Sequence, residues 1–507
     1  MNYIKNLINA FEKFKSLNAI SYKNDRLTYG QLLNLANKIS NQLQSLSIYE
    51  SPIGILCERG FEPYISILGT LFSGNFYIPI NLDDSFEKNK NIIISSNLKI
   101  IFGSEKSICR FKEKFQIEKI KINFFEVSIS SHSTYENKIL FTENDSLMYI
   151  LYTSGSTGIP KGVRISKSNI FAFTKGINNI WKLEPKYKFS QFFELSFDPS
   201  MADIFVCFIN GGELCVVPKE ELFFPIDFIV REEIDVWASV PSIGSIMIKS
   251  GKLKDNLFHN LKILCFCGEP FPKNVADILS KCAPKAEIWN CYGPTEATIY
   301  VTAFKYKLNK NSYHNGNLPI GHPLKETQVE IIDSNNNKLQ NGIKGEIVYK
   351  GPQISLGYLN DKQKTYDSFV KFEWDQSDEV WYKSGDIGIL NNNGQIECLG
   401  RLDSQIKLSG KRIEISEIEF FFKNYTLFND IVIIPVKDFN LRVSKLIGFT
   451  LVAYELIEIA KIRQLASKHI NEVFFPQKII TIEKFPFNAN GKLDRSYLLE
   501  KYYYLND

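Results

Sequence analysis

Apolar and polar positions follow two kinds of spacing along most of this chain. As far as about residue 400, short apolar runs alternate with segments in which apolar residues recur at helical spacing. This alternation predicts βαβ units with a parallel sheet. Because ligands bind outside the carboxyl ends of parallel strands, we expect the chemistry in the loops that follow the strands. The clearest predicted strands are residues 148–152, 236–240, 261–267 and 287–290.

The pattern changes after residue 402. The remaining chain alternates two helix-like segments with three short apolar runs, which is typical of a small α+β unit. We therefore predict an α/β protein with a large N-terminal domain of parallel-sheet βαβ subdomains, residues 1–402, and a small C-terminal α+β domain, residues 403–507. The expected helices are 415–422 and 457–470, and the expected strands are 431–435, 446–452 and 478–482.

Composition excludes several classes of protein. Of the 507 residues, 44% are hydrophobic and 23% are charged, which is ordinary for a globular protein and unlike a disordered one. The 60 Lys and Arg residues against 56 Asp and Glu leave a formal charge of +4. So small a surplus predicts no nucleic-acid partner and no anionic membrane surface. No apolar run approaches the ~18 residues that span a bilayer, so we expect no membrane insertion.

The cysteines indicate the compartment. The nine cysteines are scattered, only Cys265 and Cys267 lie close together, and no C-x2-C pair is present. This excludes a zinc ribbon or a disulfide framework and favours a reducing environment. Charged residues interrupt the apolar pattern of the N-terminus, which argues against a signal peptide. We expect a cytoplasmic protein.

The strongest local motif is the loop YTSGSTGIPKGV at residues 152–163. Its glycines allow close approach of a ligand to the backbone, and its hydroxyls and N–H groups donate to phosphate oxygens. It is not a Walker A loop, because Pro160 precedes the lysine and Gly162 follows it. A Gly/Ser loop alone is also typical of a flexible surface turn, but the preceding strand and the Pro-Lys-Gly sequence favour a phosphate site. The expected ligand-binding residues are Thr153, Ser154, Gly155, Ser156, Thr157, Gly158 and Lys161.

This loop resembles the phosphate loop of the adenylate-forming superfamily, which contains acyl-CoA synthetases, luciferases and the adenylation domains of peptide synthetases. Further motifs match in the order of that family and cover nearly the whole chain. The resemblance implies the adenylate-forming fold, ATP as a substrate and Mg²⁺ as its metal. The matching motifs are LTYGQL at residues 27–32, CYGPTE at 291–296, YKSGD at 382–386, GRLDSQIK at 400–407 and NANGKLDR at 488–495.

The resemblance assigns roles around the nucleotide. Joining a carboxylate to AMP brings two anions together, so the site must neutralise charge and orient the attack. By resemblance, Glu296 holds Mg²⁺ beside the α-phosphate and Thr295 contacts that phosphate. Tyr292 stacks on adenine, Asp386 accepts the ribose hydroxyls and Arg401 supports the ribose. Taken singly, each is more often an ordinary surface residue. The resemblance adds Asn290, Cys291 and Gly293 to the nucleotide-binding set.

Two residues of the smaller predicted domain complete the expected machinery. By resemblance, Lys492 is a catalytic cation that bridges the substrate carboxylate and the nucleotide. Asp403 is the hinge about which the small domain moves between adenylation and transfer to a thiol. The alternative for Asp403 is a helix cap or a salt bridge.

Asp198 indicates which carboxylate is activated. An apolar acyl chain gains nothing from a carboxylate in its pocket, whereas an amino acid needs a partner for its ammonium group. Asp198 lies at that position of amino-acid-activating members, in the stretch FDPS at 197–200. The alternative is a surface aspartate in an Asp-Pro turn. Ala202, Cys267 and Ile299 are the other expected substrate-binding residues.

Within the superfamily, the chain most resembles the D-alanine–D-alanyl carrier protein ligases. In these, a cysteine in the stretch FCGE crowds the Cα of the amino acid and favours the D-enantiomer, and Cys267 holds that place here. Its alternative role is that of a small buried hydrophobe. Departures at the pocket are Pro199 for leucine and Ala202 for methionine, which predict a pocket large enough for a somewhat larger amino acid. Other departures are Cys291 for a threonine, Ser404 for an aromatic residue, and Phe475-Pro476 for Met-x-Pro.

We therefore expect ATP-dependent activation of a small amino acid, D-alanine or a similar or slightly larger one, as its adenylate. Transfer to the phosphopantetheine thiol of a separate carrier protein follows, because the chain ends soon after Lys492 and leaves no room for a fused carrier. Two alternatives remain at this point. One is an acyl-CoA synthetase, which gives no reason for Asp198, and the other is a non-catalytic nucleotide-binding protein.

Overall fold

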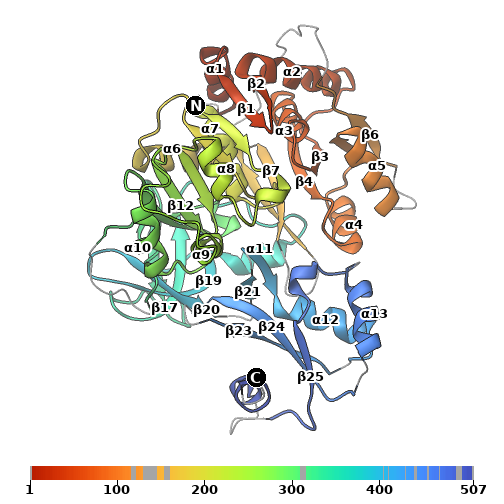
Figure 1. Cartoon of the computed structure of the whole chain (residues 1–507), viewed down its shortest axis with the longest axis vertical. Helices are drawn as coiled ribbons and strands as arrows, with labels where there is room; N and C mark the ends of the chain where they lie inside the picture. The colour runs from red at the N-terminus through yellow and green to blue at the C-terminus, as the bar shows by residue number, and fades with distance from the viewer. Residues whose placement is uncertain are drawn as a thin grey trace. The chain divides into compact units, whose positions relative to one another are not determined.

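The computed structural model forms two compact units, whose helices and strands are labelled in Figure 1. Unit 1 comprises Met1–Leu82, Ile92–Tyr152 and Lys161–Leu402. Unit 2 comprises Asp83–Asn91, Thr153–Pro160 and Asp403–Asp507. The structure describes residues 3–115, 121–129, 146–153, 160–308, 316–402, 405–408, 410–428, 430–438, 442–453, 456–467, 469–486 and 494–504.

A nine-stranded sheet forms the centre of unit 1, in the order β15-β14-β13-β12-β11-β9-β10-β1-β2. The pairs from β13 to β1 are parallel, and the pairs at both ends are antiparallel. Every residue of β10, β11 and β12 is buried, as in a parallel sheet covered on both faces. The strands are β1 Asn18–Tyr22, β2 Asp25–Thr28, β9 Lys188–Gln191, β10 Glu213–Val216, β11 Val236–Ser239, β12 Ile263–Cys267, β13 Glu287–Tyr292, β14 Thr302–Lys305 and β15 His322–Pro323.

A six-stranded sheet, in the order β6-β5-β3-β4-β7-β8, carries the strands on either side of the Gly/Ser/Thr loop. Its registered pairs among β3 to β7 are parallel. The predicted parallel α/β architecture is thus confirmed. The strands are β3 Pro52–Cys57, β4 Phe76–Asn81, β5 Ile100–Gly103, β6 Asn123–Glu126, β7 Leu147–Thr153 and β8 Lys161–Ser166.

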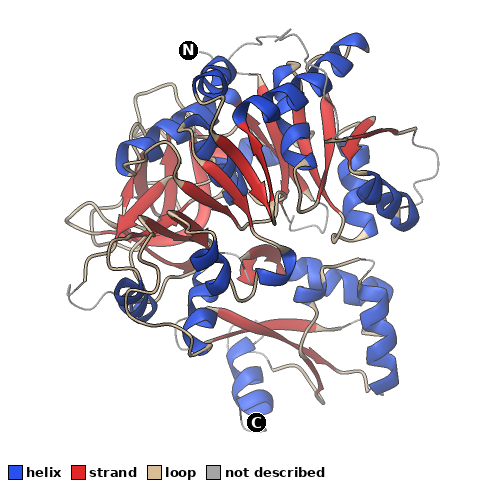
Figure 2. Ribbon diagram, turned by 45° about the horizontal axis from the view of Figure 1, so that its top comes forward, coloured by secondary structure: helices blue, strands red, loops and turns tan. Residues whose placement is uncertain are grey.

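Helices pack against these two sheets (Figure 2). The sequence fixes their starts locally: the Thr28 hydroxyl accepts from the Gln31 amide, and the Gln31 side chain accepts from the Thr28 amide at 2.8 Å. Helix α7 starts with Pro199 directly after Asp198, where the fixed φ of proline suits a first turn. The helices are α1 Tyr3–Lys13, α2 Tyr29–Ser45, α3 Glu62–Phe72, α4 Phe86–Ser95, α5 Glu105–Lys114, α6 Lys167–Ile180, α7 Pro199–Ile209, α8 Ile226–Arg231, α9 Pro241–Lys249, α10 Lys273–Cys282 and α11 Lys362–Ser368.

A third, antiparallel sheet lies in the last part of unit 1, where the sequence pattern suggested only parallel units. Burial alternates along β19, as expected for a strand with one face in the core. Strand β19 pairs with β17, β18 and β20, and β17 also pairs with β16. The strands are β16 Gln328–Ile332, β17 Gly345–Lys350, β18 Phe369–Val370, β19 Trp381–Leu390 and β20 Ile396–Arg401.

Unit 2 contains a hairpin and a three-stranded sheet whose strands β23 and β24 are antiparallel and β24 and β25 parallel. Its core includes Ile418, Phe422, Ile433, Leu446 and Ile462. This α+β composition agrees with the predicted fold class, while the hinge motion stays a prediction. The elements are β21 Gln405–Leu408, β22 Lys411–Glu414, α12 Ile415–Tyr425, β23 Val432–Lys437, β24 Val443–Thr450, α13 Leu456–Ala466, β25 Lys478–Thr481 and α14 Arg495–Leu499.

Membrane-spanning elements were searched for separately. Among the described residues, no helix combines the length and the apolar character needed to cross a bilayer.

Candidate functional site

The candidate site begins at one edge of the nine-stranded sheet. Strands β11, β12 and β13 are adjacent and parallel, so their carboxyl ends meet at that edge. The segments that leave them carry Ser242, Glu269 and the loop of residues 293–300. The Glu269 carboxylate accepts from the backbone amide of Ser242 at 3.0 Å, which ties the first two of these segments together. The loops in which the sequence predicts ligand binding therefore lie along the same edge of the sheet.

Tyr292, Asp386 and Arg401 form a connected group. Asp386 and Arg401 are directly opposite each other on β19 and β20, and Arg401 donates to Asp386 Oδ1 at 2.8 Å. The Tyr292 hydroxyl donates to Asp386 Oδ2. Burial, followed by the charge of Asp386, holds the pKa of Tyr292 well above its ordinary value, so this phenol stays a donor. The structure thus brings together three predicted nucleotide-binding residues from separate motifs.

Glu296 provides a buried carboxylate on the loop after β13. It lies in the short 3-10 helix Thr295–Ala297, and only 1% of its surface is exposed. Its Oε1 accepts from the hydroxyl of Tyr358 at 2.8 Å. Among the described residues, no three His, Cys, Asp or Glu side chains cluster as a metal site. A single hard carboxylate fits Mg²⁺ held chiefly by substrate phosphates, and not a metal caged by protein.

The backbone of the same loop is strained. Thr298 and Ile299 have φ values of 58° and 71°, which are uncommon for β-branched residues. A Cβ on Gly293 would lie 2.3 Å from the Ile299 carbonyl oxygen, so the loop closes on itself only because residue 293 is glycine. Gln353 holds the strained turn by donating to the carbonyls of Thr298 at 3.2 Å and Tyr300 at 2.7 Å. The loop is therefore fixed in one conformation.

Asn290 and Cys291 are buried side chains of β13. The Asn290 amide donates to the carbonyls of Leu318 and Pro319, and Cys291 is 1% exposed. Both side chains serve the core, so a nucleotide contact from them would have to come from the backbone. Their predicted binding role stays a prediction.

The predicted amino-acid-binding residues are close-packed. The exposed fractions of Ala202, Cys267 and Ile299 are 4%, 2% and 1%. The Cys267 thiol donates to the Tyr300 hydroxyl at 3.5 Å. Asp198 is half-buried at the start of α7, and its charge adds to burial in raising the pKa of Tyr149 well above the ordinary value. Asp198 thus lies within electrostatic range of a buried tyrosine.

Some predicted residues fall on the phosphate loop and on the smaller unit. Thr153 ends β7, and Lys161, which begins β8, is half-buried. Outside the described residues lie Ser154, Gly155, Ser156, Thr157, Gly158, Asp403 and Lys492.

The sequence analysis missed Tyr358 and Gln353. Both lie in the 353–359 segment, which carries side chains to Glu296 and to the strained turn. The sequence GPQISLGYLN at residues 351–360 contains two glycines that signal a turn, but a tyrosine-to-glutamate contact between distant segments has no local signature.

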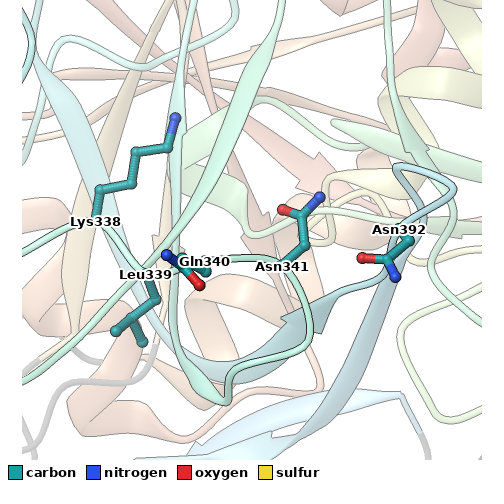
Figure 3. Close-up of a pocket in the computed structure, with 5 residues that line it drawn as sticks. All are labelled: Lys338, Leu339, Gln340, Asn341 and Asn392. Atoms are coloured by element: carbon teal, nitrogen blue, oxygen red, sulfur yellow. The ribbon is translucent and has the colours of Figure 1, made fainter.

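An open hollow lies elsewhere in unit 1 (Figure 3). Its volume is about 570 Å³, and it lies between the turn that precedes β17 and the turn that follows β19. None of the predicted site residues lines it. Its lining residues are Lys338, Leu339, Gln340, Asn341 and Asn392.

Comparisons with known proteins show the family and the fold. The family described as AMP-binding enzyme matches residues 8–359. A D-alanine–D-alanyl carrier protein ligase of Bacillus licheniformis is 31% identical over 498 residues, which cover 94% of this chain and 95% of the relative. The crystal structure of the Vibrio cholerae adenylation domain AlmE in complex with glycyl-adenosine-5'-phosphate is similar with a TM-score of 0.88 and 25% identity, covering 98% of this chain and 97% of that one.

A second solved structure shows the same fold. It is a holo NRPS protein containing adenylation and PCP domains, and the TM-score is 0.82 at 20% identity. The match covers 99% of this chain and 84% of that one.

Proposed function

This chain belongs to the family of AMP-binding enzymes, and on that premise we propose that it is an amino-acid–carrier protein ligase. It activates a small amino acid with ATP as the aminoacyl-adenylate and passes it to the phosphopantetheine thiol of a separate carrier protein. The observation that carries the proposal is the joining of Tyr292, Asp386 and Arg401 beside the loop that bears Glu296. The name of the Bacillus licheniformis relative and the glycyl-adenylate bound to AlmE support an amino acid as the substrate.

Asp386 and Tyr292 bind the nucleoside. Asp386 accepts the ribose hydroxyls, and Arg401 neutralises its charge from the opposite strand. Tyr292 stacks on adenine, with Tyr349 packed behind it at a ring-centroid distance of 6.2 Å. Because the Asp386 oxygens already accept from Tyr292 and Arg401, the carboxylate is oriented before ATP arrives.

Thr295 and the phosphate loop bind the phosphates. Thr295 contacts the α-phosphate, and Lys161 with the hydroxyls and amides of the loop neutralises the outer phosphates. Glu296 would hold Mg²⁺, which supplies positive charge beside the phosphate oxygens. Lys492 brings a further positive charge between the substrate carboxylate and the α-phosphate. A carboxylate oxygen then attacks the α-phosphorus, and pyrophosphate leaves.

Asp198 binds the ammonium group of the amino acid. The side-chain end is bounded by Ala202, Cys267 and Ile299, which the protein's own atoms bury almost completely. The substrate we propose is D-alanine or a similar or slightly larger amino acid. We propose that Cys267, whose thiol donates to the Tyr300 hydroxyl, crowds the Cα of the amino acid and so favours the D-enantiomer.

Transfer uses the same bound adenylate. After the small domain turns about Asp403, the pantetheine sulfur attacks the acyl carbon, the thiol loses its proton and AMP leaves. We place the enzyme in the cytoplasm, where ATP is abundant. None of the nine cysteines, all of which lie among the described residues, forms a disulfide, which supports a reducing compartment.

The test is ATP–pyrophosphate exchange with a panel of D- and L-amino acids and with fatty acids as controls. We expect strong exchange with glycine or alanine and none with fatty acids. Lys492→Ala should abolish exchange and leave ATP binding intact. Exchange with fatty acids only would refute the assignment of Asp198.

A further inference from the structure

Tyr358 connects the 353–359 segment to Glu296. The backbone carbonyl of Glu296 accepts from the Ser355 amide at 2.9 Å, and its carboxylate accepts from the Tyr358 hydroxyl. Both the main chain and the side chain of Glu296 are therefore tied to the 353–359 segment.

The same segment pairs with β8, the strand that leaves the phosphate loop. Leu356 donates to the Arg164 carbonyl at 3.0 Å, Arg164 donates to the Gly357 carbonyl at 3.0 Å, and Leu359 donates to the Gly162 carbonyl at 2.7 Å. Tyr358 lies opposite Val163 in this antiparallel bridge. Strand β8 is an edge strand of its sheet, and the segment covers that edge.

The ring of Tyr358 has little freedom. It is 5% exposed and packs edge-to-face on Phe369 at 5.9 Å. Its backbone amide donates to the Thr365 hydroxyl at 3.0 Å. The hydroxyl is therefore held in place by β8, α11 and β18, which lie outside the loop that carries Glu296.

We propose that Tyr358 is a positioning residue that fixes the Glu296 carboxylate relative to β8, in the orientation in which Glu296 would bind the Mg²⁺ of ATP. The inference rests on the proposed function, because it assigns Glu296 to the Mg²⁺ of bound ATP. A residue that orients a metal ligand changes metal affinity when it is lost, while leaving the ligand itself in place.

The experiment compares Tyr358→Phe with Tyr306→Phe. Tyr306 is a matched control, because it is also a buried tyrosine whose hydroxyl bonds a carboxylate, that of Asp277, away from the candidate site. In Tyr358→Phe, the Mg²⁺ concentration that gives half-maximal pyrophosphate exchange should rise by about 10-fold or more, as for other losses of a hydrogen bond to a metal ligand. In Tyr306→Phe it should stay unchanged, and melting temperatures will show that both variants fold.

A binding measurement keeps the test independent of turnover. Calorimetry of ATP with and without Mg²⁺ gives the gain in affinity due to the metal, and this gain should be smaller in Tyr358→Phe than in the parent and in Tyr306→Phe. Equal gains in all three would overturn the inference. If the unsubstituted protein showed no pyrophosphate exchange with any acid, the proposed function would be refuted. The calorimetric comparison would still decide the role of Tyr358.

A double-mutant cycle separates positioning from general packing. In a Glu296→Gln background the carboxylate is gone, so adding Tyr358→Phe should change the Mg²⁺ dependence no further. A full additional loss in that background would mean that the tyrosine acts only through stability, which would contradict the proposal.

Discussion

The two ends of the candidate site are built by different interactions. The proposed nucleotide end, Tyr292 with Asp386 and Arg401, depends on hydrogen bonds and opposite charges across two paired strands. The proposed amino-acid end combines the acidic residue Asp198 with three buried side chains, Ala202, Cys267 and Ile299. In our proposal, the nucleotide end recognises groups that every ATP molecule carries, and the amino-acid end selects the substrate by its charge and size. Changes at the nucleotide end should therefore alter affinity for ATP, and changes at the amino-acid end should alter which acid is used.

The largest effect should come from a change of Asp198 at the amino-acid end. Asp198→Asn should lower kcat/KM for the amino acid by about 100-fold, because a hydrogen bond to a charged group is worth roughly 1.5–3 kcal/mol. The KM for ATP should not change. Kinetics of pyrophosphate exchange measure both values, and Asp227→Asn, at an exposed surface pair with Lys252, is the control. A loss shared equally between ATP and amino acid would show that the two ends are not separate.

The reciprocal change is made at the nucleotide end. Asp386→Asn should raise the KM for ATP by about 10- to 100-fold, because it weakens acceptance of the ribose hydroxyls and leaves Arg401 without its partner charge. The ranking of amino acids should stay the same. A competition assay with 2'-deoxy-ATP and 3'-deoxy-ATP adds a check, since the variant should discriminate less between these and ATP. Unchanged discrimination would show that Asp386 does not recognise the ribose hydroxyls.

A change in the loop of residues 293–300, which joins the two ends, should affect the binding of both ATP and the amino acid. Gly293→Ala places a methyl group 2.3 Å from the Ile299 carbonyl oxygen, and relief of such a contact typically costs about 1–3 kcal/mol of stability. Because Ile299 belongs to the amino-acid end and Tyr292 to the nucleotide end, both KM values should rise. Melting temperature and exchange kinetics are the measurements. Gly176→Ala is the control, since its added methyl group meets only neighbours at 3.4 Å or more.

Sequence reasoning succeeded where local pattern and tertiary structure agree. The buried strands β11 and β12 followed from short, mainly apolar runs. Asp386 and Arg401, which the family motifs indicated, lie opposite each other on β19 and β20, while their roles stay predictions. The antiparallel sheet did not follow. On β19, Ser384, Asp386 and Gly388 are buried while Ile387 is only partly so, which reverses the usual relation between apolar residues and burial.

Contacts between distant segments could also not be predicted from the sequence. The bond from Tyr358 to Glu296 depends on pairing of the 353–359 segment with β8, and such pairing is decided by the whole fold. Pocket size also stays a prediction. Ala202 is 4% exposed to solvent, and its small side chain, compared with methionine, predicts room for a somewhat larger amino acid.

The smallest expected effect tests that pocket size directly. Ala202→Met should lower activity toward larger amino acids more than toward glycine or alanine, changing their ratio of kcat/KM by about 10-fold, since one methylene in an apolar pocket is worth roughly 1–3 kcal/mol. Ala202→Gly is its opposite and should raise the relative activity of larger acids. Neither substitution should change the KM for ATP, because the nucleotide end is held by its own strand pair. An Ala202→Met enzyme that prefers larger amino acids would mean that volume at this position does not select the substrate.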